Sequence, residues 1–580
     1  MNEEFRDIKR NIKTWDEVIE TLQNVYSKLD LRDGILKHPE YYKDIDTVAL
    51  LKQATKECLF SNCIFNFDFS IDLFKDAYIK YVDSLNNQQD QTLSLVYSGG
   101  INFNKNDLFF IPPLKFENCE FNSQILFSNL EFKNYLIFED CIINAYTSFN
   151  GSIFNQLLLF NHTTTIDCVK KINSENSQLL IDFSEATFNE NVFISGCSFS
   201  MGIIFSGATF LKEFNILEGQ CSKKNFNALL VFRHTEFNRS FSCSCSFSDQ
   251  FVFENCLFKE NVYIITNKNS VKSYLKISKC KFNSHVRIRN SEIYKIDIHN
   301  NIFENYTDFS QLISKSTFSC LENYFELQAI FNNTIFEDDC FIERNYFKSS
   351  AIFRDATFIK KVCFNDTISN NKIIIQNASL KALPLRNVNI ESFQFIQCDW
   401  DYDFWGNKLI CDEDEKVKST FSELEEIFRR LKKSALTNLD QEQASDWHYK
   451  EKKFALKNSF INIFKSFSNV IKTIYLFLYY FLSGFGEKPF RALLVLLVAV
   501  VLPIGISYLW GPSYQSKYFS WESNHITLVS RWLWYLPFIN SQIEGARITD
   551  WNYFWKGVFH LLITIQAALF AFALRNKLRR

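Results

Sequence analysis

The fold is decided by the stretch FNNTIFEDDCFIERNYFKSSAIFRDATFIKKVCF, residues 331–364. Large apolar side chains recur in it at steps that alternate between five and six residues, at Phe331, Phe336, Ile342, Phe347, Phe353, Phe358 and Phe364. An amphipathic helix requires a spacing of about 3.6 residues, and a half-buried strand requires strict alternation. Neither pattern fits. The steps settle at five residues toward Trp400, where the pattern stops.

A small or short side chain lies two residues before most of the large ones. Ala351 precedes Phe353 in this way and, far upstream, Cys58 precedes Phe60. Residues i−2 and i of an extended segment point to the same side. A short extended segment followed by a corner, repeated on four faces, therefore predicts a coil of roughly 20–22 residues whose turns stack at strand spacing. The small residue is needed because converging side chains leave no room for a second large one.

The composition agrees with this interpretation and excludes several classes of protein. Phe makes up 63 of the 580 residues, whereas Gly (15) and Pro (8) are scarce, which argues against collagen and Gly-rich phosphate loops. The formal net charge of −2 argues against a protein built on gross attraction to nucleic acid. The amino terminus has no apolar signal segment. The 16 cysteines are therefore interpreted as reduced thiols that serve as small buried fillers.

The segments FNNTIF, FRDATF, FSEATF, FENCLF and ISKCKF resemble the repeats of the pentapeptide-repeat proteins. The resemblance implies a mainly β fold, a right-handed four-sided parallel β-helix over residues 58–400 with insertions. The large position is mostly Phe, where many members of the family use Leu, which implies a wider or less regular coil. Interruptions at about 71–114, 160–180, 213–228 and 265–275 are expected to be loops or inserted helices, with Phe74–Leu85 as one such helix.

Capped helices are predicted on both sides of the repeats. Residues 1–57 are expected to form a helical N-terminal cap, because the capping-box signature TWDE begins at Thr14, before an apolar helical pattern. Residues 401–458 are expected to form a charged linker and a helical hairpin, whose first helix begins at the TFSE signature of Thr420. This helical connector resembles that of membrane-bound pentapeptide-repeat proteins.

Residues 459–580 are predicted to be a membrane region. They contain an interfacial amphipathic segment at 469–486 and two candidate transmembrane helices at 492–510 and 553–574. Lys and Arg are concentrated before the first span and after the second, and they are scarce between the spans. The positive-inside rule therefore predicts a multi-pass protein of a bacterial-type inner (plasma) membrane with both termini in the cytoplasm.

Two features of this region leave alternatives open. The aromatic stretch 528–538 is interpreted as a segment on the outer membrane surface, and the alternative is a re-entrant pore helix. Gln566 in the second span favours hydrogen bonding between helices of a homo-oligomer, and the alternative is a contact with the first span of the same chain.

No motif of known chemistry is visible in the sequence, neither a phosphate-binding loop nor a dinucleotide fingerprint nor a zinc-like Cys/His array. His234, His285 and His299 are expected to face outward or to lie in corners. The pair Cys243 and Cys245 is one residue too tight for a CxxC redox motif. We therefore predict that the protein is not an enzyme, with no catalytic, cofactor-binding or metal-ligating residue and no cofactor.

The predicted function is that of a non-enzymatic, membrane-anchored scaffold whose cytoplasmic β-helix binds a protein or another extended partner. The expected partners are the lipid bilayer, a protein and further copies of the chain, and nucleic acid is not expected. One alternative is a membrane effector whose two spans oligomerise and permeabilise the membrane. A less favoured alternative, by resemblance to soluble pentapeptide-repeat proteins that mimic duplex DNA, is a topoisomerase binder. That function requires an acidic outer track, whereas Arg344, Lys348 and Arg354 stand among the acids here.

Overall fold

A computed structural model of the chain separates it into two compact units. The first comprises Met1–Leu383 with Asn387–Asp401, and the second comprises Pro384–Arg386 with Tyr402–Arg580. The residues that the structure describes are 11–13, 16–17, 20, 58–65, 69–70, 76, 113–165, 180–197, 202–217, 229–245, 250–266, 273–380, 383, 385, 388–400, 420–510, 513–514, 529, 532–537, 539, 546–547 and 550–578.

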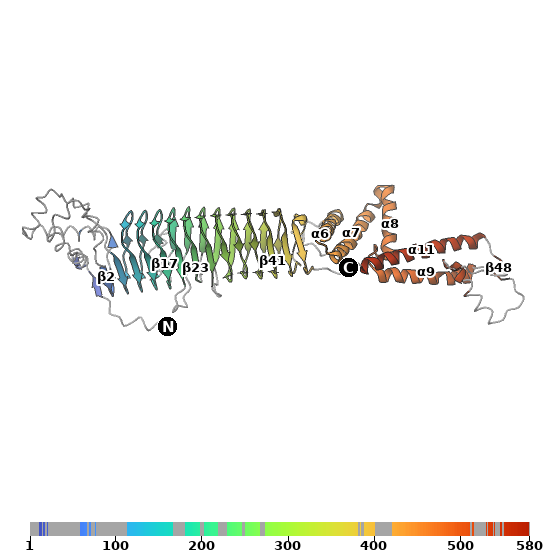
Figure 1. Cartoon of the computed structure of the whole chain (residues 1–580), viewed down its shortest axis with the longest axis horizontal. Helices are drawn as coiled ribbons and strands as arrows, with labels where there is room; N and C mark the ends of the chain where they lie inside the picture. Colours follow the sequence, from blue (N-terminus) through green and yellow to red (C-terminus); the bar gives the residue numbers. More distant parts are fainter. Residues whose placement is uncertain are drawn as a thin grey trace, which may run out of the picture. The chain divides into compact units, whose positions relative to one another are not determined.

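The first unit is a mainly β structure, a parallel β-solenoid whose strands stack as rows of parallel arrows (Figure 1). Each short strand pairs with its counterpart in the next turn, so the strands form long parallel sheets. The sheets have 14 strands from β2 (Cys58–Ser61) to β46 (Phe393–Ile396), 12 from β4 (Phe69–Ser70) to β43 (Val362–Cys363), 11 from β8 (Glu131–Phe132) to β44 (Ile368–Ser369), five from β1 (Asn11–Lys13) to β14 (Thr164–Thr165) and four from β30 (Glu292–Ile293) to β42 (Thr357–Phe358).

One turn illustrates the register. The chain passes through β38 (Ile335–Phe336), β39 (Cys340–Glu343), β40 (Tyr346–Phe347) and β41 (Ala351–Arg354) before β42 pairs with β38. Phe336 then lies opposite Phe358. Equivalent residues of neighbouring turns, such as Asn323 and Asn345, are 22 residues apart in this part of the solenoid, which agrees with the length predicted for a coil.

Phenylalanine rings form stacked columns inside the solenoid. The predicted interior residues are all buried: Phe331, Phe336, Phe347, Phe353 and Phe358, with Ala351 and Ala356. The ring centres of Phe331 and Phe353 lie 4.5 Å apart and the ring planes are nearly parallel, at 4°. Burial of one such ring stabilises the fold by about 1.5–3 kcal/mol, and contacts between rings add to this. Phe331 and Phe353 are separated by four successive steps of the five- and six-residue pattern, so rings stack once per turn of the solenoid.

Many corners of the solenoid are built on left-handed backbone at residues other than glycine. Their φ angles lie between 48° and 59°, and Asn300, Gln311, Glu322, Asn333, Arg344, Asp355, Asp366 and Asn377 are examples. This conformation costs most L-residues about 1–2 kcal/mol and is easiest for Asn and Asp. His234 is exposed and occupies such a corner, as predicted. His299 is half-buried and lies on the outward side of β31 (Lys295–His299), and His285 is half-buried just before β29 (Val286–Ile288).

The small residue that follows such a corner is often a hydrogen-bond donor. Thr334 Oγ1 donates to the carbonyl of Phe309 in the neighbouring turn (3.1 Å), and Cys141 Sγ donates to that of Phe116 (3.3 Å). Buried carbonyl groups need such partners. The described cysteines are thiols and all but Cys398 are buried, as predicted, but several of them also satisfy the backbone at a corner.

Three asparagines extend this arrangement into a buried ladder, Asn301, Asn323 and Asn345. Asn323 Nδ2 donates to the carbonyl of Ile298 (2.9 Å) and to Asn345 Oδ1 (3.0 Å). Asn323 Oδ1 accepts a hydrogen bond from the backbone amide of Asn301 (3.0 Å). The amide groups of Asn301 and Asn323 are thus bonded to the turns on either side, and that of Asn345 is bonded to the preceding turn.

The region of the predicted N-terminal cap contributes a strand to the solenoid. β1 pairs in parallel with β3 (Cys63–Phe65) at the edge of the five-stranded sheet. Asp16, Glu17 and Glu20 are helical, and the rest of the predicted cap helix lies outside the described residues. The predicted helix Phe74–Leu85 and most of the predicted interruptions also lie outside them.

The second unit is helical. Its helices are α6 (Phe421–Thr437), α7 (Gln441–Ile461), η2 (Ile463–Lys465), α8 (Phe467–Ser483), α9 (Pro489–Trp510) and α11 (Asp550–Leu578), and β47 (Ser513–Tyr514) pairs with β48 (Ala546–Arg547). The predicted capping box is present: Thr420 Oγ1 accepts from the Glu423 amide (3.2 Å) and Glu423 Oε2 accepts from the Thr420 amide (2.9 Å). α6 and α7 form the predicted hairpin, and α9 and α11 lie side by side (Figure 1).

Candidate functional site

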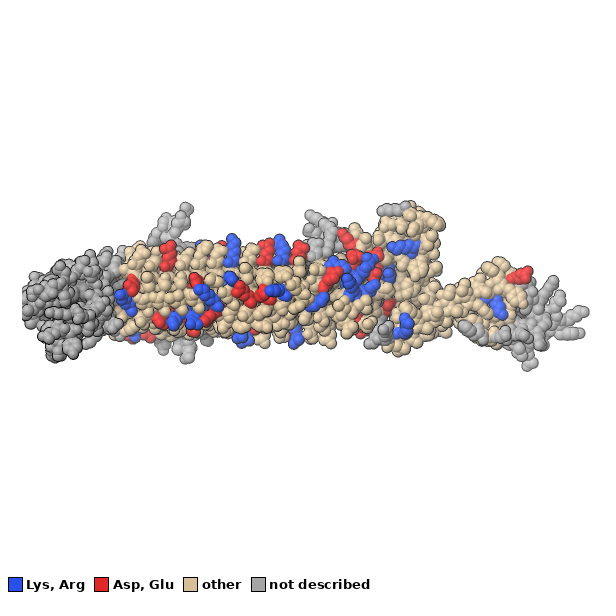
Figure 2. Space-filling view, turned by 45° about the horizontal axis from the view of Figure 1, so that its top comes forward, with Lys and Arg blue, Asp and Glu red and all other residues tan. Residues whose placement is uncertain are grey.

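The outer surface of the solenoid carries ion pairs between neighbouring turns. Arg233 pairs with Glu254 (3.2 Å), and Lys281 pairs with Glu304 (2.8 Å). Figure 2 shows acidic and basic side chains interspersed along this surface. Exposed pairs of this kind contribute little to stability. They do mix the two charges, so the face in Figure 2 carries no continuous acidic track within the described residues.

The last four positions of one outward column of the 11-stranded sheet hold aliphatic or aromatic side chains. Ile302, Tyr324, Tyr346 and Ile368 are register partners on β32 (Ile302–Phe303), β36 (Tyr324–Phe325), β40 and β44, and we call them the outer strip. The isoleucines at both ends are exposed, and the tyrosine rings stack with centres 5.5 Å apart. Exposed aliphatic and aromatic side chains in a row are typical of protein contact surfaces.

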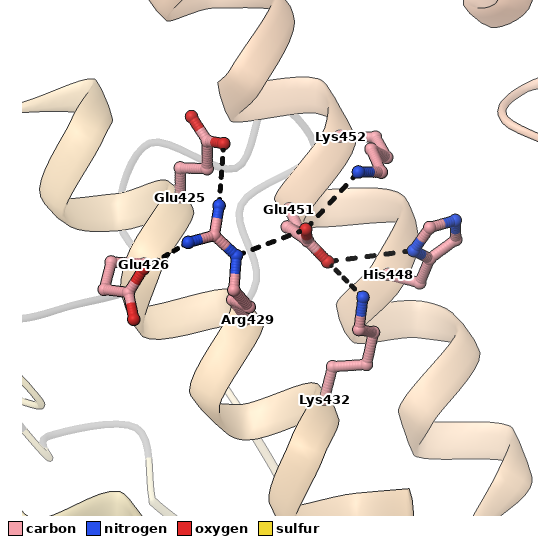
Figure 3. A network of polar contacts seen from close by, with 7 residues as sticks. All are labelled: Glu425, Glu426, Arg429, Lys432, His448, Glu451 and Lys452. Carbon is pink, nitrogen blue, oxygen red and sulfur yellow. Dashed lines mark hydrogen bonds and ion pairs between the residues drawn. The ribbon is translucent and has the colours of Figure 1, made fainter.

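A polar network joins the two helices of the hairpin around the carboxylate of Glu451 (Figure 3). Glu451 projects from α7 and is 3% exposed. From α6, Lys432 Nζ lies 2.6 Å from Oε2 and Arg429 Nε lies 3.7 Å from Oε1. From α7 itself, Lys452 Nζ lies 3.4 Å from Oε1 and His448 Nδ1 lies 3.7 Å from Oε2. Arg429 also contacts the carboxylates of two glutamates on α6, Glu425 and Glu426.

The surroundings of Glu451 keep it ionised. Burial by itself would raise the pKa of the Glu451 carboxyl. Hydrogen bonds from His448 and Lys432 outweigh burial, with help from the charges of Lys432 and Lys452, and hold this pKa well below its usual range. A carboxylate with so many donors cannot serve as a general acid at neutral pH. Its role is to fix α6 against α7.

No motif in the sequence predicts this network. The carboxylate is four residues after Trp447 and three before Phe454, both of which are buried. This spacing places Glu451 on the apolar face of α7. A charged residue on the apolar face of a helix indicates a buried polar contact. The sequence does not show its partners on α6, because they come close to it only when the hairpin has folded.

A cavity of about 280 Å³ lies beside the hairpin within the helical unit. Its lining residues are Lys432, Leu436, Gln441, Ala444, Ser445, His448, Glu487 and Asn576. The hydroxyl of Ser445 donates to the carboxylate of Glu487, and Asn576 Nδ2 donates to the carbonyl of Gly486 (3.2 Å). These bonds tie α7 and α11 to the turn before α9.

The paired helices α9 and α11 expose apolar side chains. Val498 on α9 and Leu561 on α11 are 63% and 64% exposed, and many neighbours resemble them. α11 is the one described helix that is long and apolar enough to cross a membrane by length and composition, and the apolar segment Pro489–Gly505 of α9 is shorter. The helices occur where the two spans were predicted, at 492–510 and 553–574, and α8 overlaps the predicted interfacial segment 469–486.

Gln566 makes its contacts within the chain. It is buried, and its Nε2 donates to the carbonyls of Leu482 and Ala492, each at 2.8 Å. Ala492 begins the first predicted span and Leu482 belongs to α8, whereas Gln566 Oε1 has no hydrogen-bond partner among the described residues. The contact with Ala492 agrees with the alternative of a bond to the first span, and the homo-oligomer stays a prediction.

The aromatic segment between α9 and α11 lies in an unexpected place. Trp532 Nε1 donates to the carbonyl of Val500 (2.8 Å), and Leu536 packs with Ala499 and Ile563. These partners lie near the middle of α9 and α11. Buried apolar contacts therefore hold this part of residues 528–538 against the middle of both helices, and its interpretation as a segment on the outer membrane surface stays a prediction.

Two of the cysteines singled out in the sequence lie close together. Cys243 Sγ and Cys245 Sγ lie 3.6 Å apart, and both are buried. Among the described residues, no group of three or more His, Cys, Asp or Glu side chains is arranged to hold a metal ion. Comparison with protein-family models, with curated proteins and with solved structures finds no match to this chain.

Proposed function

We propose that the protein is a non-enzymatic scaffold in which the C-terminal helices anchor the solenoid to a membrane and the solenoid binds a protein or another extended partner. The observation that carries the proposal is the outer strip. The strip places four aliphatic or aromatic side chains in register on a rigid β surface. Its two ends, Ile302 and Ile368, are exposed and accessible to a partner. Because backbone pairing fixes the spacing of the strip, a partner meets a preformed surface.

Apolar exposure on α9 and α11 supports the membrane anchor. An apolar face of this extent is unfavourable in water and favourable in hydrocarbon. The proposed protein is multi-pass in a bacterial-type inner membrane with both termini in the cytoplasm, because Lys488 and Arg491 lie at the start of α9 while Arg575 and Lys577 end α11. α8 would lie along the interface, since Phe467 and Tyr475 are exposed.

We infer that the solenoid is a right-handed, four-sided coil of the pentapeptide-repeat class with an N-terminal cap. Support comes from the small–large couplets and from corners that recur with the same backbone conformation. A single-particle map of the full chain would decide the handedness and the number of faces.

The mixed charge of the solenoid disfavours the DNA-mimic alternative. Ion pairs such as Lys281–Glu304 neutralise carboxylates that a mimic of the phosphate backbone would need. A filter-binding assay of duplex DNA and a DNA-binding enzyme tests this alternative. We expect that addition of the full chain does not displace the DNA from the enzyme.

The scaffold proposal is tested by purification of the full chain from detergent-solubilised membranes of its own cells. The outer-strip variant Ile302→Lys/Ile368→Lys should lose a protein that the unchanged chain retains. The control Leu211→Lys/Ile359→Lys adds the same charge at exposed positions outside the strip and should retain it. Retention of the same proteins by all three chains would overturn the proposal that the strip binds a partner.

A second candidate function is membrane permeabilisation. It is favoured by the packing of Trp532 and Leu536 against the middle of α9 and α11. If these helices span a bilayer, the segment lies at membrane depth, as a re-entrant segment does. Ion flux through liposomes that contain the full chain distinguishes the two functions, because an anchor leaves the liposomes tight.

A further inference from the structure

Six basic or tyrosine side chains converge where α7 meets the end of α8 and the start of α9. They are Tyr449, Lys450, Lys453, Tyr480, Lys488 and Arg491, and we call them the basic–aromatic cluster. Lys488 Nζ lies 5.1 Å from the ring centre of Tyr449, and Arg491 Cζ lies 4.3 Å from that of Tyr480. The two rings are themselves 6.5 Å apart. Lys488 and Arg491 therefore lie over the two rings of one tyrosine pair.

The position of Lys488 is built into the fold. Gly484 ends α8 in the left-handed conformation (φ +57°). A Cβ atom there would lie 2.9 Å from Lys488 Cγ and 3.7 Å from Tyr449 Cε2. Glycine therefore makes room for the stem of Lys488 against Tyr449. Within the described part of the chain, no carboxylate forms an ion pair with Lys488 or Arg491.

Positive charge is crowded in the cluster. Lys450 is partly buried, with its Nζ 4.5 Å from the ring centre of Trp447. Burial, together with the nearby charges of Lys488 and Lys453, lowers the pKa of Lys450 to about 7, and the charge of Asp446 acts in the opposite direction. A bound anion would relieve this repulsion, so the cluster favours a negatively charged ligand.

The donors of the cluster suit a phosphate group. A guanidinium offers a planar fork to phosphate oxygens, and ammonium groups add compact charge. Burial, together with the neighbouring Tyr480, raises the pKa of Tyr449 to about 12, so Tyr449 adds no negative charge to the cluster. Lys488 and Arg491 are also next to the first apolar turns of α9, where a membrane-inserted chain meets lipid headgroups, and basic pockets beside spans bind acidic headgroups.

We propose that the basic–aromatic cluster binds the phosphate of an anionic phospholipid headgroup. This inference rests on the proposed membrane anchor, which brings the cluster to headgroup level. Apolar helices alone do not distinguish one lipid from another. The site would make the anchor selective for lipids with an anionic headgroup.

The test measures binding of soluble short-chain phosphatidylglycerol and phosphatidylcholine to the full chain in detergent by native mass spectrometry. The unchanged chain should bind phosphatidylglycerol about tenfold more tightly than phosphatidylcholine, and Lys488→Gln/Arg491→Gln should remove this preference. Lys212→Gln/Lys433→Gln removes the same charge at exposed positions outside the cluster and should keep it. Lys488→Arg/Arg491→Lys keeps both charges and should still prefer phosphatidylglycerol. That result would show that the Gln variant loses the preference because it loses the charges, and not because it misfolds.

Three outcomes would overturn the site. The first is that the chain binds the two lipids equally, and the second is that the control variant also loses the preference for phosphatidylglycerol. The third is that inorganic phosphate binds as tightly as phosphatidylglycerol, which would identify a soluble ligand. Flotation with vesicles of pure phosphatidylcholine tests the anchor separately. A chain that floats but shows no lipid preference disproves the site alone, and a chain that prefers phosphatidylglycerol but does not float disproves the anchor alone.

Discussion

The solenoid and the helical unit are held together by opposite kinds of contact. In the solenoid the same contact recurs in each turn, such as the ring stack of Phe331 on Phe353 or the asparagine ladder. In the helical unit the decisive polar contacts occur once, as at Glu451 and Gln566. Repetition makes a contact visible as a period in the sequence, whereas a single contact depends on partners far along the chain.

The largest expected difference concerns deletion of a segment. Removal of residues 323–344 joins Glu322 to Asn345, which should take the place of Asn323 because the two are 22 residues apart in equivalent positions. The full chain lacking these residues should keep one cooperative unfolding transition of its β structure, measured by circular dichroism. The shorter deletion 323–340 joins Glu322 to Phe341, puts an outward side chain at an inward position and should abolish that transition. Equal behaviour of the two deletions would contradict the register.

Truncation of one ring is the next largest effect. Phe331→Ala removes a fully buried side chain whose ring centre is 4.9 Å from that of Phe309 and 4.5 Å from that of Phe353. It should cost about 3–5 kcal/mol of unfolding free energy, by loss of burial and by the cavity left behind. Denaturant unfolding measures this. Ile359→Ala, at a 59% exposed position, is the control and should change stability by less than about 0.5 kcal/mol.

The spacing of large side chains was sufficient to predict the solenoid and its interior, because volume and alternation are properties of single residues. The hydrogen bonds at the corners were missed, since spacing does not show which way a donor points. A signal did exist: Asn333 precedes Thr334 and Asp140 precedes Cys141, and Asn and Asp favour left-handed backbone. In the helical unit the capping box at Thr420 was predictable because it is local, whereas the Glu451 network was not.

Loss of the Glu451 charge should cost less than loss of a ring. Glu451→Gln leaves Lys432 and Arg429 without their buried anionic partner. This should lower the free energy of opening the hairpin by about 2–3 kcal/mol. Because the pKa of Glu451 is lowered in the folded protein, its contribution is complete above the usual value of 4.5 and is lost as the pH falls below it. Hydrogen exchange of residues 420–461 in the full chain measures the opening of the hairpin at each pH.

The control for this charge is Glu426→Gln, which removes an exposed partner of the same arginine. It should change hairpin opening by less than about 0.5 kcal/mol at any pH. A pH-independent effect of Glu451→Gln, or an equal effect of both substitutions, would show that burial of the carboxylate does not stabilise the hairpin.

The smallest expected effect concerns a single corner. Thr334→Val keeps the volume of the side chain and removes the donor to the carbonyl of Phe309, which should cost about 1–2 kcal/mol. Thr357→Val, at an exposed position of the next turn, is the matched control and should be nearly neutral. Denaturant unfolding measures the stability of both variants. If the small residue only fills space, Thr334→Val and Thr357→Val should have the same stability.

The most direct test of the account is whether the helical unit inserts into a lipid bilayer and holds the solenoid there. Membranes from bacterial cells that produce the full chain are washed with alkaline carbonate and floated on a density gradient. We expect the chain to float with the lipid, and Leu561→Arg/Ile565→Arg, which adds charge at exposed positions of α11, to reduce the floating fraction. Release of the unchanged chain into the soluble fraction by the carbonate wash would contradict the account.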